Sequence, residues 1–283
     1  MHVSPTSSPT APSPPSGKFG QFGQLPDIGT HSALFLDFDG TLADLASEPE
    51  AVEVASGVIP ALVRLSEQLG GALAIVSGRR LSDLDSFLAP LRLPAAAEHG
   101  AQRRQADGRV ISLATPDVQQ VARRAAEWAA HHDGLRVEIK SAAVALHYRH
   151  APALEAECLQ VMQQAADGTP GVELLRGKYV FEVKPASVSK GTAIRAFMTE
   201  PPFAGRQPLF AGDDVTDEDG FTAVQALGGE GIKVGEGPTL ARHRCDSPAA
   251  LRQWLHAALG GPAEDAAEAK DRLPQTATEE SRP

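Results

Sequence analysis

The sequence predicts an α/β fold in which a parallel sheet with crossover helices carries an inserted α+β segment. Over most of the chain, short continuous apolar runs alternate with segments of helical period, as they do where helices join parallel strands. The interval 105–182 differs, because its strands alternate polar and apolar residues like a half-solvated antiparallel sheet. A length of 283 residues is enough for about two domains. We therefore expect the inserted interval to be a domain of its own.

The parallel core is expected in two blocks, residues 31–104 and 183–260, on either side of the insertion. Continuous apolar runs mark its strands, because a strand inside a parallel sheet is buried on both faces. Helices are expected where apolar residues recur every three to four positions. The expected elements are strands at 32–38, 72–76, 208–211 and 231–234, and helices at 58–69, 82–87, 190–198 and 221–227.

The inserted segment is expected to have the order αββαββ and an antiparallel sheet. Alternation of polar and apolar side chains marks its strands, since one face of such a sheet meets solvent. The expected elements are helices at 117–131 and 152–166, and strands at 135–140, 143–149, 172–175 and 178–183.

Both ends of the chain lack the pattern of a folded element. The first sixteen residues contain five Pro, five Ser and two Thr, and no apolar run follows them. Residues 1–30 are therefore expected to be a disordered extension and not a secretory signal. Gly260, Gly261 and Pro262 end the last helical pattern, so residues 261–283 are expected to be a disordered tail.

The overall composition excludes several classes of protein. A net charge of −10 opposes electrostatic attraction to nucleic acid or to an anionic membrane surface. No apolar run approaches the ~20 residues that cross a bilayer. Cys158 and Cys245 lack the spacing of a zinc site or a disulfide framework, so both are expected to be small core residues. We expect a monomeric, cytoplasmic protein without nucleic-acid or membrane partners.

Two carboxylates stand where the first buried strand ends. Asp37 and Asp39 are two positions apart, and with a strand period of two they point to the same face. Such a pair needs a divalent cation or a shared proton, because like charges repel. One carboxylate can attack a phosphoryl group while the other serves as acid and base. The alternative is a polar turn at the strand end.

Two further segments carry groups that bind phosphate. Ser77, Gly78 and Arg79 follow the second buried strand, so a hydroxyl and a backbone N–H emerge where ligands of open α/β sheets bind. Lys190 opens a helix after the insertion and can neutralise a phosphoryl oxygen, a role for which Lys184 competes. Taken singly, such a tripeptide is more often a plain turn, and a lysine at a helix start is more often a surface residue.

The acidic run at 212–220 predicts a metal site. It crowds five carboxylates into seven positions after a buried strand, although a solvated acidic loop is the alternative. All candidate ligands are oxygens, which indicates Mg²⁺. An EF-hand is excluded, because its spacing would put Val215 and Ala226 where carboxylates are required. Nucleotide-binding glycine loops are also absent from the sequence.

Four segments in this chain order resemble the haloacid dehalogenase (HAD) superfamily of phosphohydrolases, whose core is Rossmann-like. They are 37–39, 77–79, Lys190 and 212–220. The resemblance implies that Asp37 is the nucleophile and that Asp39 is the acid and base. It also implies that Lys190 neutralises charge at the catalytic centre. The phosphate would be held by Thr41, Ser77, Gly78 and Arg79, and Mg²⁺ by Asp37, Asp39 through its backbone carbonyl, Asp213 and Asp214.

Further segments resemble the trehalose-6-phosphate phosphatases over essentially the whole folded part. These are 97–101 (AEHGA), 145–149 (ALHYR), 178–185 (KYVFEVKP), 189–191 (SKG) and 212–221 (GDDVTDEDGF). The resemblance implies that the insertion is a cap closing over a small-molecule sugar phosphate. It also places the loop of His99 near the sugar.

The strands expected in the insertion present one polar face. By strand parity, apolar residues such as Val137 and Phe181 take the opposite face. The polar face is either merely solvated or, as the resemblance favours, a binding surface for sugar hydroxyls. Its residues are Glu138, Lys140, His147, Arg149, Lys178 and Glu182.

The activity we expect is Mg²⁺-dependent hydrolysis of trehalose 6-phosphate through an aspartyl-phosphate intermediate. A related enzyme acting on another sugar phosphate would differ only in cap chemistry. A phosphomutase would share the nucleophile but exclude water from its intermediate. A catalytically silent binding module is the alternative outside enzymology, and the intact pair of Asp37 and Asp39 speaks against it.

Overall fold

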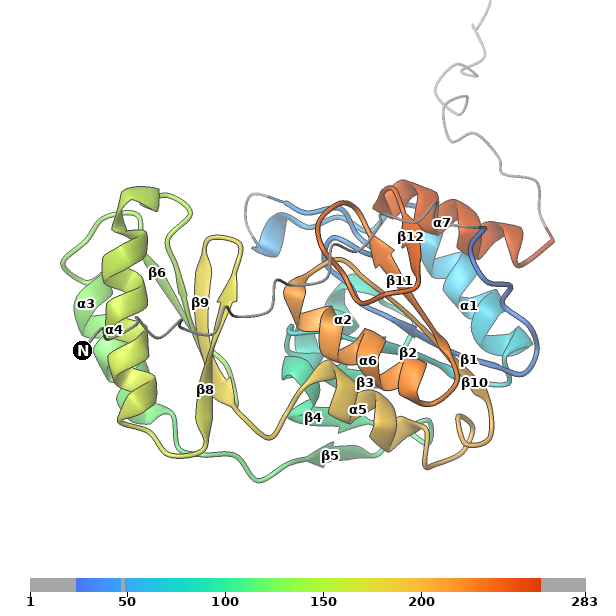
Figure 1. The fold of residues 1–283 in the computed structure, drawn as a ribbon, viewed down its shortest axis with the longest axis horizontal. Helices are drawn as coiled ribbons and strands as arrows, with labels where there is room; N and C mark the ends of the chain where they lie inside the picture. Colours follow the sequence, from blue (N-terminus) through green and yellow to red (C-terminus); the bar gives the residue numbers. More distant parts are fainter. Residues whose placement is uncertain (1–23, 47–48, 261–283) are drawn as a thin grey trace, which may run out of the picture.

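The computed structural model describes residues 24–46 and 49–260, which form two units, each built around one sheet. We call the unit with the eight-stranded sheet the core and the unit with the four-stranded sheet the cap. Figure 1 shows the cap beside the core, joined to it by extended segments of chain. The core sheet has eight strands, in the spatial order β12 (His243–Cys245), β11 (Glu230–Val234), β10 (Gln207–Gly212), β1 (Ser32–Leu36), β2 (Leu73–Val76), β3 (Ala95–Ala97), β4 (Gln102–Arg104) and β5 (Val110–Ser112).

The strands of the core sheet from β12 to β3 are parallel, and β4 and β5 extend the sheet as an antiparallel edge. All five residues of β1 are buried, as expected for a strand with helices on both faces. The chain continues from β1 to β2 on one side, while β10 pairs on the other. The carboxyl end of β1 is thus a topological switch point, where ligands of open α/β sheets bind.

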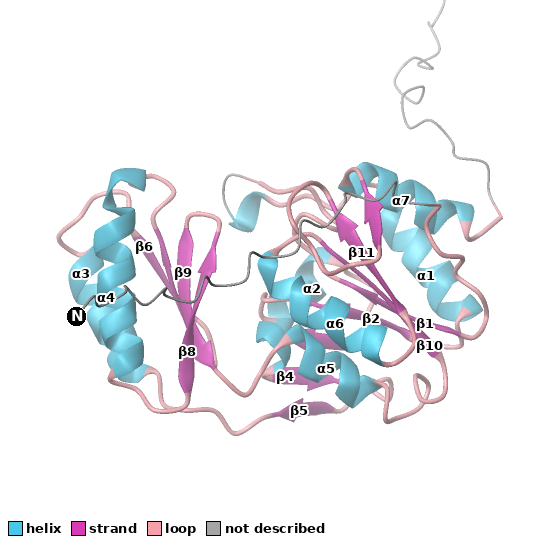
Figure 2. Ribbon diagram, in the orientation of Figure 1, coloured by secondary structure: helices cyan, strands magenta, loops and turns pink. Residues whose placement is uncertain are grey.

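Helices cover both faces of the core sheet (Figure 2). On one face α1 contacts α7, and on the other α5 contacts α6. Ser189 begins α5 with a capping box, which satisfies the backbone donors of the first turn. The core helices are α1 (Val58–Gln68), α2 (Leu81–Phe87), α5 (Lys190–Phe197), α6 (Glu218–Ala226) and α7 (Pro248–Ala257), with short 3-10 turns η1 (Pro49–Ala51), η2 (Glu98–Gly100) and η4 (Val215–Asp217).

The cap has a four-stranded antiparallel sheet that two helices cover on the side away from the core (Figure 1). Phe181, Val183 and Leu146 point towards these helices and are buried in a separate apolar cluster with Met162. The other face of the sheet turns towards the core. The cap elements are α3 (Gln119–Ala129), β6 (Arg136–Ile139), β7 (Val144–His147), η3 (Pro152–Leu154), α4 (Glu155–Asp167), β8 (Val172–Gly177) and β9 (Val180–Pro185), with the strands in the order β6-β7-β9-β8.

The predicted fold class is confirmed. Several element ends differ by a few residues, such as that of β1, which ends at Leu36, and the structure differs from the expected domain limits in three places. β5 belongs to the core sheet although its residues fall in the interval 105–182, because a half-solvated hairpin strand can also extend the edge of a parallel sheet. β9 continues to Pro185, beyond the expected end of the insertion. Within the expected extension 1–30, Ile28 is buried in the core and Pro26 accepts a hydrogen bond from Trp254. Residues 1–23 and 261–283 lie outside the described residues.

Two composition-based expectations can be compared with the described part of the chain. Cys158 and Cys245 are both buried and free, as predicted. Between residues 24 and 260, apart from 47 and 48, no helix is long and apolar enough to cross a membrane.

Candidate active site

A cleft of about 1100 Å³ lies between the carboxyl ends of the core strands and the polar face of the cap sheet. Thr41 is fully buried beneath it. The structure thus brings core and cap candidates to one cavity. The predicted site residues that line it are Asp37, Asp39, Ser77, Gly78, Arg79, His99, Glu138, Lys140, His147, Arg149, Lys178, Glu182, Lys190, Asp213 and Asp214.

Asp37 lies directly after β1 at the bottom of the cleft and is only 3% exposed. Lys190 Nζ donates a hydrogen bond of 2.6 Å to its Oδ1. Thr41 Oγ1 lies 3.2 Å from its Oδ2 and 3.3 Å from Asp213 Oδ1, so the single hydroxyl hydrogen serves one carboxylate at a time. Burial raises the pKa of Asp37, and Lys190 opposes that rise. The carboxylate is therefore held in place by its cationic partner.

Of the two candidate lysines, Lys190 and Lys184, Lys190 lines the cleft. Its ammonium also donates to Asp217 Oδ1 at 2.7 Å. Burial disfavours the charged form, but Asp217 and Asp37 outweigh it and raise the pKa of Lys190. Lys184 instead donates to Glu173 and, at 2.7 Å, to the carbonyl of Val188. The competition between the two lysines is thus decided by position.

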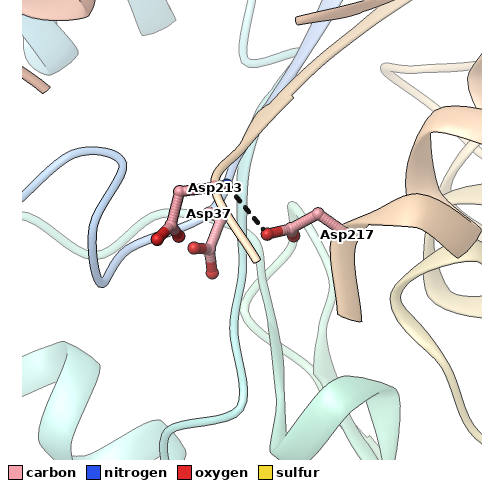
Figure 3. Close-up of side chains that lie close together, drawn as sticks. All are labelled: Asp37, Asp213 and Asp217. Atoms are coloured by element: carbon pink, nitrogen blue, oxygen red, sulfur yellow. Dashed lines mark hydrogen bonds between the residues drawn. The ribbon is translucent and has the colours of Figure 1, made fainter. Parts of the chain in front are cut away.

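Three carboxylates converge at the carboxyl ends of β1 and β10 (Figure 3). Asp37, Asp213 and Asp217 each offer an oxygen, and these atoms lie within 4.8 Å of one another. Burial and Asp217 raise the pKa of Asp213 to about 6. Lys190 pairs with Asp37 and Asp217, and Lys233 lies beside Asp213, so these two cations leave the three carboxylates with a net negative charge. A donor set of oxygens with that charge fits a divalent cation such as Mg²⁺.

The acidic run contributes a different second residue to this cluster than expected. Asp214 is exposed, and its side chain accepts the N–H of Val215 at 2.6 Å, so it lies outside the tight group although it lines the cleft. Asp217 is fully buried, and its Oδ2 accepts the backbone N–H groups of Asp213 (3.0 Å) and Asp214 (2.9 Å). Figure 3 shows the first of these bonds. Asp217 therefore organises the loop that carries Asp213 and Asp214.

Asp39 is held by Arg79 at the side of the cleft. Arg79 Nε and Nη2 donate to the two carboxylate oxygens at 2.7 and 2.6 Å. The guanidinium lies 4.7 Å from the ring centre of Phe87 and 5.5 Å from that of Phe38. Such a bidentate, stacked arrangement fixes both side chains.

The loop after β2 packs closely on His99. Ser77 Oγ accepts the N–H of Arg79 at 3.2 Å, which leaves the Ser77 hydroxyl hydrogen available to a ligand. A Cβ at Gly78 would lie 2.7 Å from the His99 ring, so only glycine fits there. His99 Nε2 is buried without a hydrogen-bond partner among the described residues, 3.6 Å from Glu182. Burial lowers the pKa of His99, which favours the neutral ring.

The cap contributes charged pairs to the opposite wall. Lys140 Nζ donates to Glu182 at 3.0 and 3.1 Å and to the carbonyl of Gly78 at 3.0 Å. Burial opposes both charges, yet each holds the other ionised, so the pKa of Lys140 is raised and that of Glu182 is well below its usual range. Glu138 pairs with His147 at 3.1 Å, and this hydrogen bond lowers the pKa of Glu138. The polar face is thus a network of donors and acceptors.

Two further cap residues complete this wall. Arg149 lies 5.3 Å from the ring centre of Tyr179, a cation–π distance. Lys178 is exposed and lines the cleft.

The trehalose-phosphatase family model matches residues 35–249. The chain belongs to this family. A trehalose-6-phosphate phosphatase of Escherichia coli (strain K12) is 40% identical over 232 residues, which cover 81% of this chain and 87% of that protein. A probable trehalose-phosphate phosphatase of Sinorhizobium fredii is 46% identical over 205 residues, which cover 72% of this chain and 77% of that protein.

Solved structures carry the same fold. A trehalose-6-phosphate phosphatase related protein is 29% identical, with a TM-score of 0.65 over 79% of this chain and 95% of that one. The C-terminal domain of a C. albicans trehalose-6-phosphate phosphatase is 23% identical, with a TM-score of 0.73 over 82% of this chain and 93% of that one, and shows likeness of fold. The chain is accordingly a phosphoric monoester hydrolase, and its fold is that of the HAD phosphatases.

Several residues at the site were not predicted from the sequence. Asp217 stands in the acidic run and follows Asp213 by four positions, a spacing that could have indicated it. Lys233 donates to the carbonyls of Asp213 and Val234, both at 2.7 Å, and nothing in its strand pattern indicates that role. Glu98 lies beside the expected His99 but contacts the cap instead of the cleft.

Proposed function

We propose that this enzyme hydrolyses trehalose 6-phosphate to trehalose and phosphate through an aspartyl phosphate on Asp37. One observation carries the proposal: a buried carboxylate held by Lys190 and Thr41 faces a wall of sugar-compatible donors and acceptors across a single cleft. The curated relatives named for this phosphatase activity support the choice of substrate. Monomeric state and cytoplasmic location stay predictions of the proposal.

In the first step, an oxygen of Asp37 attacks the phosphorus, the bond from phosphorus to the sugar oxygen breaks, and an aspartyl phosphate forms. Asp39 gives the departing oxygen its proton. The dianionic phosphate competes with Asp39 for the guanidinium of Arg79, so substrate entry weakens this ion pair and allows Asp39 to carry a proton. Lys190 offsets the charge that gathers on the phosphoryl oxygens.

In the second step, Asp39 takes a proton from water, and that water attacks the phosphorus of the aspartyl phosphate. The bond between the Asp37 oxygen and phosphorus breaks, which frees the carboxylate and releases phosphate. The hydroxyl of Ser77 and the backbone N–H of Gly78, which follow β2 and line the cleft, would hold the phosphate during both steps.

Asp37, Asp213 and the backbone carbonyl of Asp39 are the groups that would hold Mg²⁺, and Asp217 would orient them. When bound, the ion balances the charge of the carboxylates and the phosphate. Removal of divalent cations with excess EDTA should stop phosphate release, and Mg²⁺ should restore it. Full activity in EDTA would remove the metal from the proposal.

The deciding experiment is phosphate release from a panel of sugar phosphates in the presence of Mg²⁺. We expect the highest kcat/KM for trehalose 6-phosphate, with glucose 6-phosphate and p-nitrophenyl phosphate far behind. A higher kcat/KM for another sugar phosphate would make that compound the proposed substrate, and the proposed chemistry of the core residues would stay unchanged. No phosphate release from any of them would overturn it.

A further inference from the structure

One acidic side chain of the core binds the cap without reaching the cleft. Glu98, in η2, is 2% exposed. Its Oε1 accepts the N–H (3.2 Å) and the hydroxyl (2.7 Å) of Ser141, and its Oε2 accepts the N–H of Ala142 (2.9 Å). Ser141 and Ala142 form the turn between β6 and β7 of the cap. A core carboxylate therefore satisfies the donors of a cap turn.

The loop that carries Glu98 is itself tied to the loop after β2. The backbone N–H of Glu98 donates to the carbonyl of Arg79 at 2.8 Å, and that of His99 donates to the carbonyl of Ser77 at 2.9 Å. Glu98 and His99 have φ values of 48° and 59°, in the left-handed region that residues with side chains seldom adopt. Such a backbone persists only where its surroundings hold it, here by hydrogen bonds on both sides.

The β6–β7 turn, which Glu98 holds, also positions Lys140, a cap residue that lines the cleft. Lys140 immediately precedes the turn, and its ammonium spans from Glu182 in the cap to the carbonyl of Gly78 in the core. Ala142 packs with Ala101 and Val188 in a small buried apolar cluster below the turn. The β6–β7 turn is thus the point where the cap rests on the phosphate side of the core.

We infer that Glu98 is a positioning residue, which anchors the β6–β7 turn and thereby sets Lys140 and Glu182 over the phosphate. The inference rests on the proposed function for its substrate. Glu98 does not line the cleft but a smaller cavity of about 420 Å³ at the junction of core and cap. All of its hydrogen bonds from the cap come from the turn, so it acts through the turn and not on the sugar.

The test compares Glu98→Gln, Ser141→Ala and the double variant on two substrates. Glu98→Gln loses the negative charge and one acceptor, so we expect kcat/KM for trehalose 6-phosphate to fall roughly tenfold, with less than about a twofold change for p-nitrophenyl phosphate. Ser141→Ala removes one of the three donors to Glu98. It should lower kcat/KM for trehalose 6-phosphate relative to p-nitrophenyl phosphate by a smaller factor. Because both act through one contact, the double variant should be no worse than Glu98→Gln.

A matched control is Glu200→Gln, which also removes the charge of a core carboxylate, but one whose partners Arg103 and Gln105 belong to the β4–β5 hairpin of the core and not to the cap. It should leave the ratio of the two kcat/KM values unchanged. Equal losses on both substrates in the Glu98→Gln variant would overturn the inference. So would a double variant whose loss is the product of two measurable single losses, because the two changes would then act independently. If Glu98→Gln does not fold, the same question is decided by the ratio of the kcat/KM values of the Ser141→Ala variant for the two substrates.

Hydrogen exchange separates this inference from the proposed function. The amides of Ser141 and Ala142 should exchange faster in Glu98→Gln whatever the preferred sugar phosphate is. Unchanged exchange in a folded variant would overturn the anchoring role. If trehalose 6-phosphate is a poor substrate, the kcat/KM of each variant is compared between p-nitrophenyl phosphate and the preferred sugar phosphate of the panel. The anchoring role of Glu98 can therefore be tested even if the proposed function is wrong.

Discussion

The core and the cap meet at one cleft but hold their polar groups in different ways. In the core, groups 153 and 172 positions apart are brought into contact at strand ends, as Lys190 with Asp37 and Thr41 with Asp213. In the cap, the paired groups belong to one small sheet: Glu138 and His147 lie on neighbouring strands, and Lys140 at the end of β6 reaches Glu182 on β9. The core can therefore fix a reacting geometry, while an exposed residue of the cap face such as Lys178 can change with less damage to the fold. The comparison predicts that core changes abolish chemistry and that cap changes alter substrate choice.

The sharpest test of the core is Asp37→Asn. The amide keeps the shape of the side chain but does not attack phosphorus, so we expect kcat to fall by about 10⁴-fold or more on every substrate. Phosphate release measures the loss, and circular dichroism checks that the variant is folded. Ordinary turnover by a folded variant would contradict the mechanism.

Asp39→Asn should have the next largest effect. Loss of the acid and base is expected to lower kcat by about 10²–10⁴-fold for esters with a poor leaving group. With p-nitrophenyl phosphate the leaving group needs no acid, so only the water step loses its base. Phosphorylated Asp37 should then accumulate during turnover of this substrate, which mass spectrometry of the quenched enzyme detects. Wild-type kinetics in this variant would remove Asp39 from its role.

In the cap, Lys178→Ala and Glu182→Ala should separate selectivity from stability. Either change is expected to remove roughly 1–3 kcal/mol of transition-state stabilisation for the disaccharide phosphate and little for p-nitrophenyl phosphate. Only Glu182→Ala also leaves Lys140 buried without its carboxylate, so the free energy of unfolding should fall by up to about 3–5 kcal/mol. Steady-state kinetics and urea unfolding measure the two effects.

For these cap variants, equal kinetic losses on both substrates would show that the damage extends to the core. No kinetic loss on either substrate would identify the polar face as merely solvated.

The smallest effect is expected at an exposed contact between the regions. Arg136 of β6 binds Glu50 of η1, and this hydrogen bond lowers the pKa of Glu50 from 4.5 to about 2. A depressed folded pKa means that the stabilisation is present above about pH 4.5 and is lost as pH falls towards about 2. Since Glu50 is exposed, Glu50→Gln should cost less than about 1 kcal/mol at pH 7, and less still in high salt.

The measurement is the difference in free energy of unfolding between wild type and Glu50→Gln at several pH values. The difference should shrink as the pH is lowered through about 4.5. A difference that grows on acidification would contradict the assigned pair.

The sequence alone determined the fold class and most of the elements that carry the site. Buried parallel strands read as continuous apolar runs, so β1, β2 and β10 were expected close to where they lie. β3 was missed because its three alanines have little strand preference, and their pairing with β2 and β4 makes them a strand. The αββαββ order of the cap followed from alternation.

For the site, the sequence determined which residue types stand at the strand ends, and Asp37, Lys190 and Asp213 do meet. Only the tertiary structure showed which of the acidic residues in the run 212–220 joins the carboxylate cluster. Local sequence does not show that Asp217 turns inward while Asp214 faces solvent, because this depends on Lys190 and the two amides that Asp217 accepts. The contact of Glu98 with Ser141 joins residues 43 positions apart, one in the core and one in the cap, so only the folded chain shows it. Lys184 is kept from the cleft by Glu173 on the neighbouring strand and by the carbonyl of Val188, and the alternation of its strand does not indicate either partner.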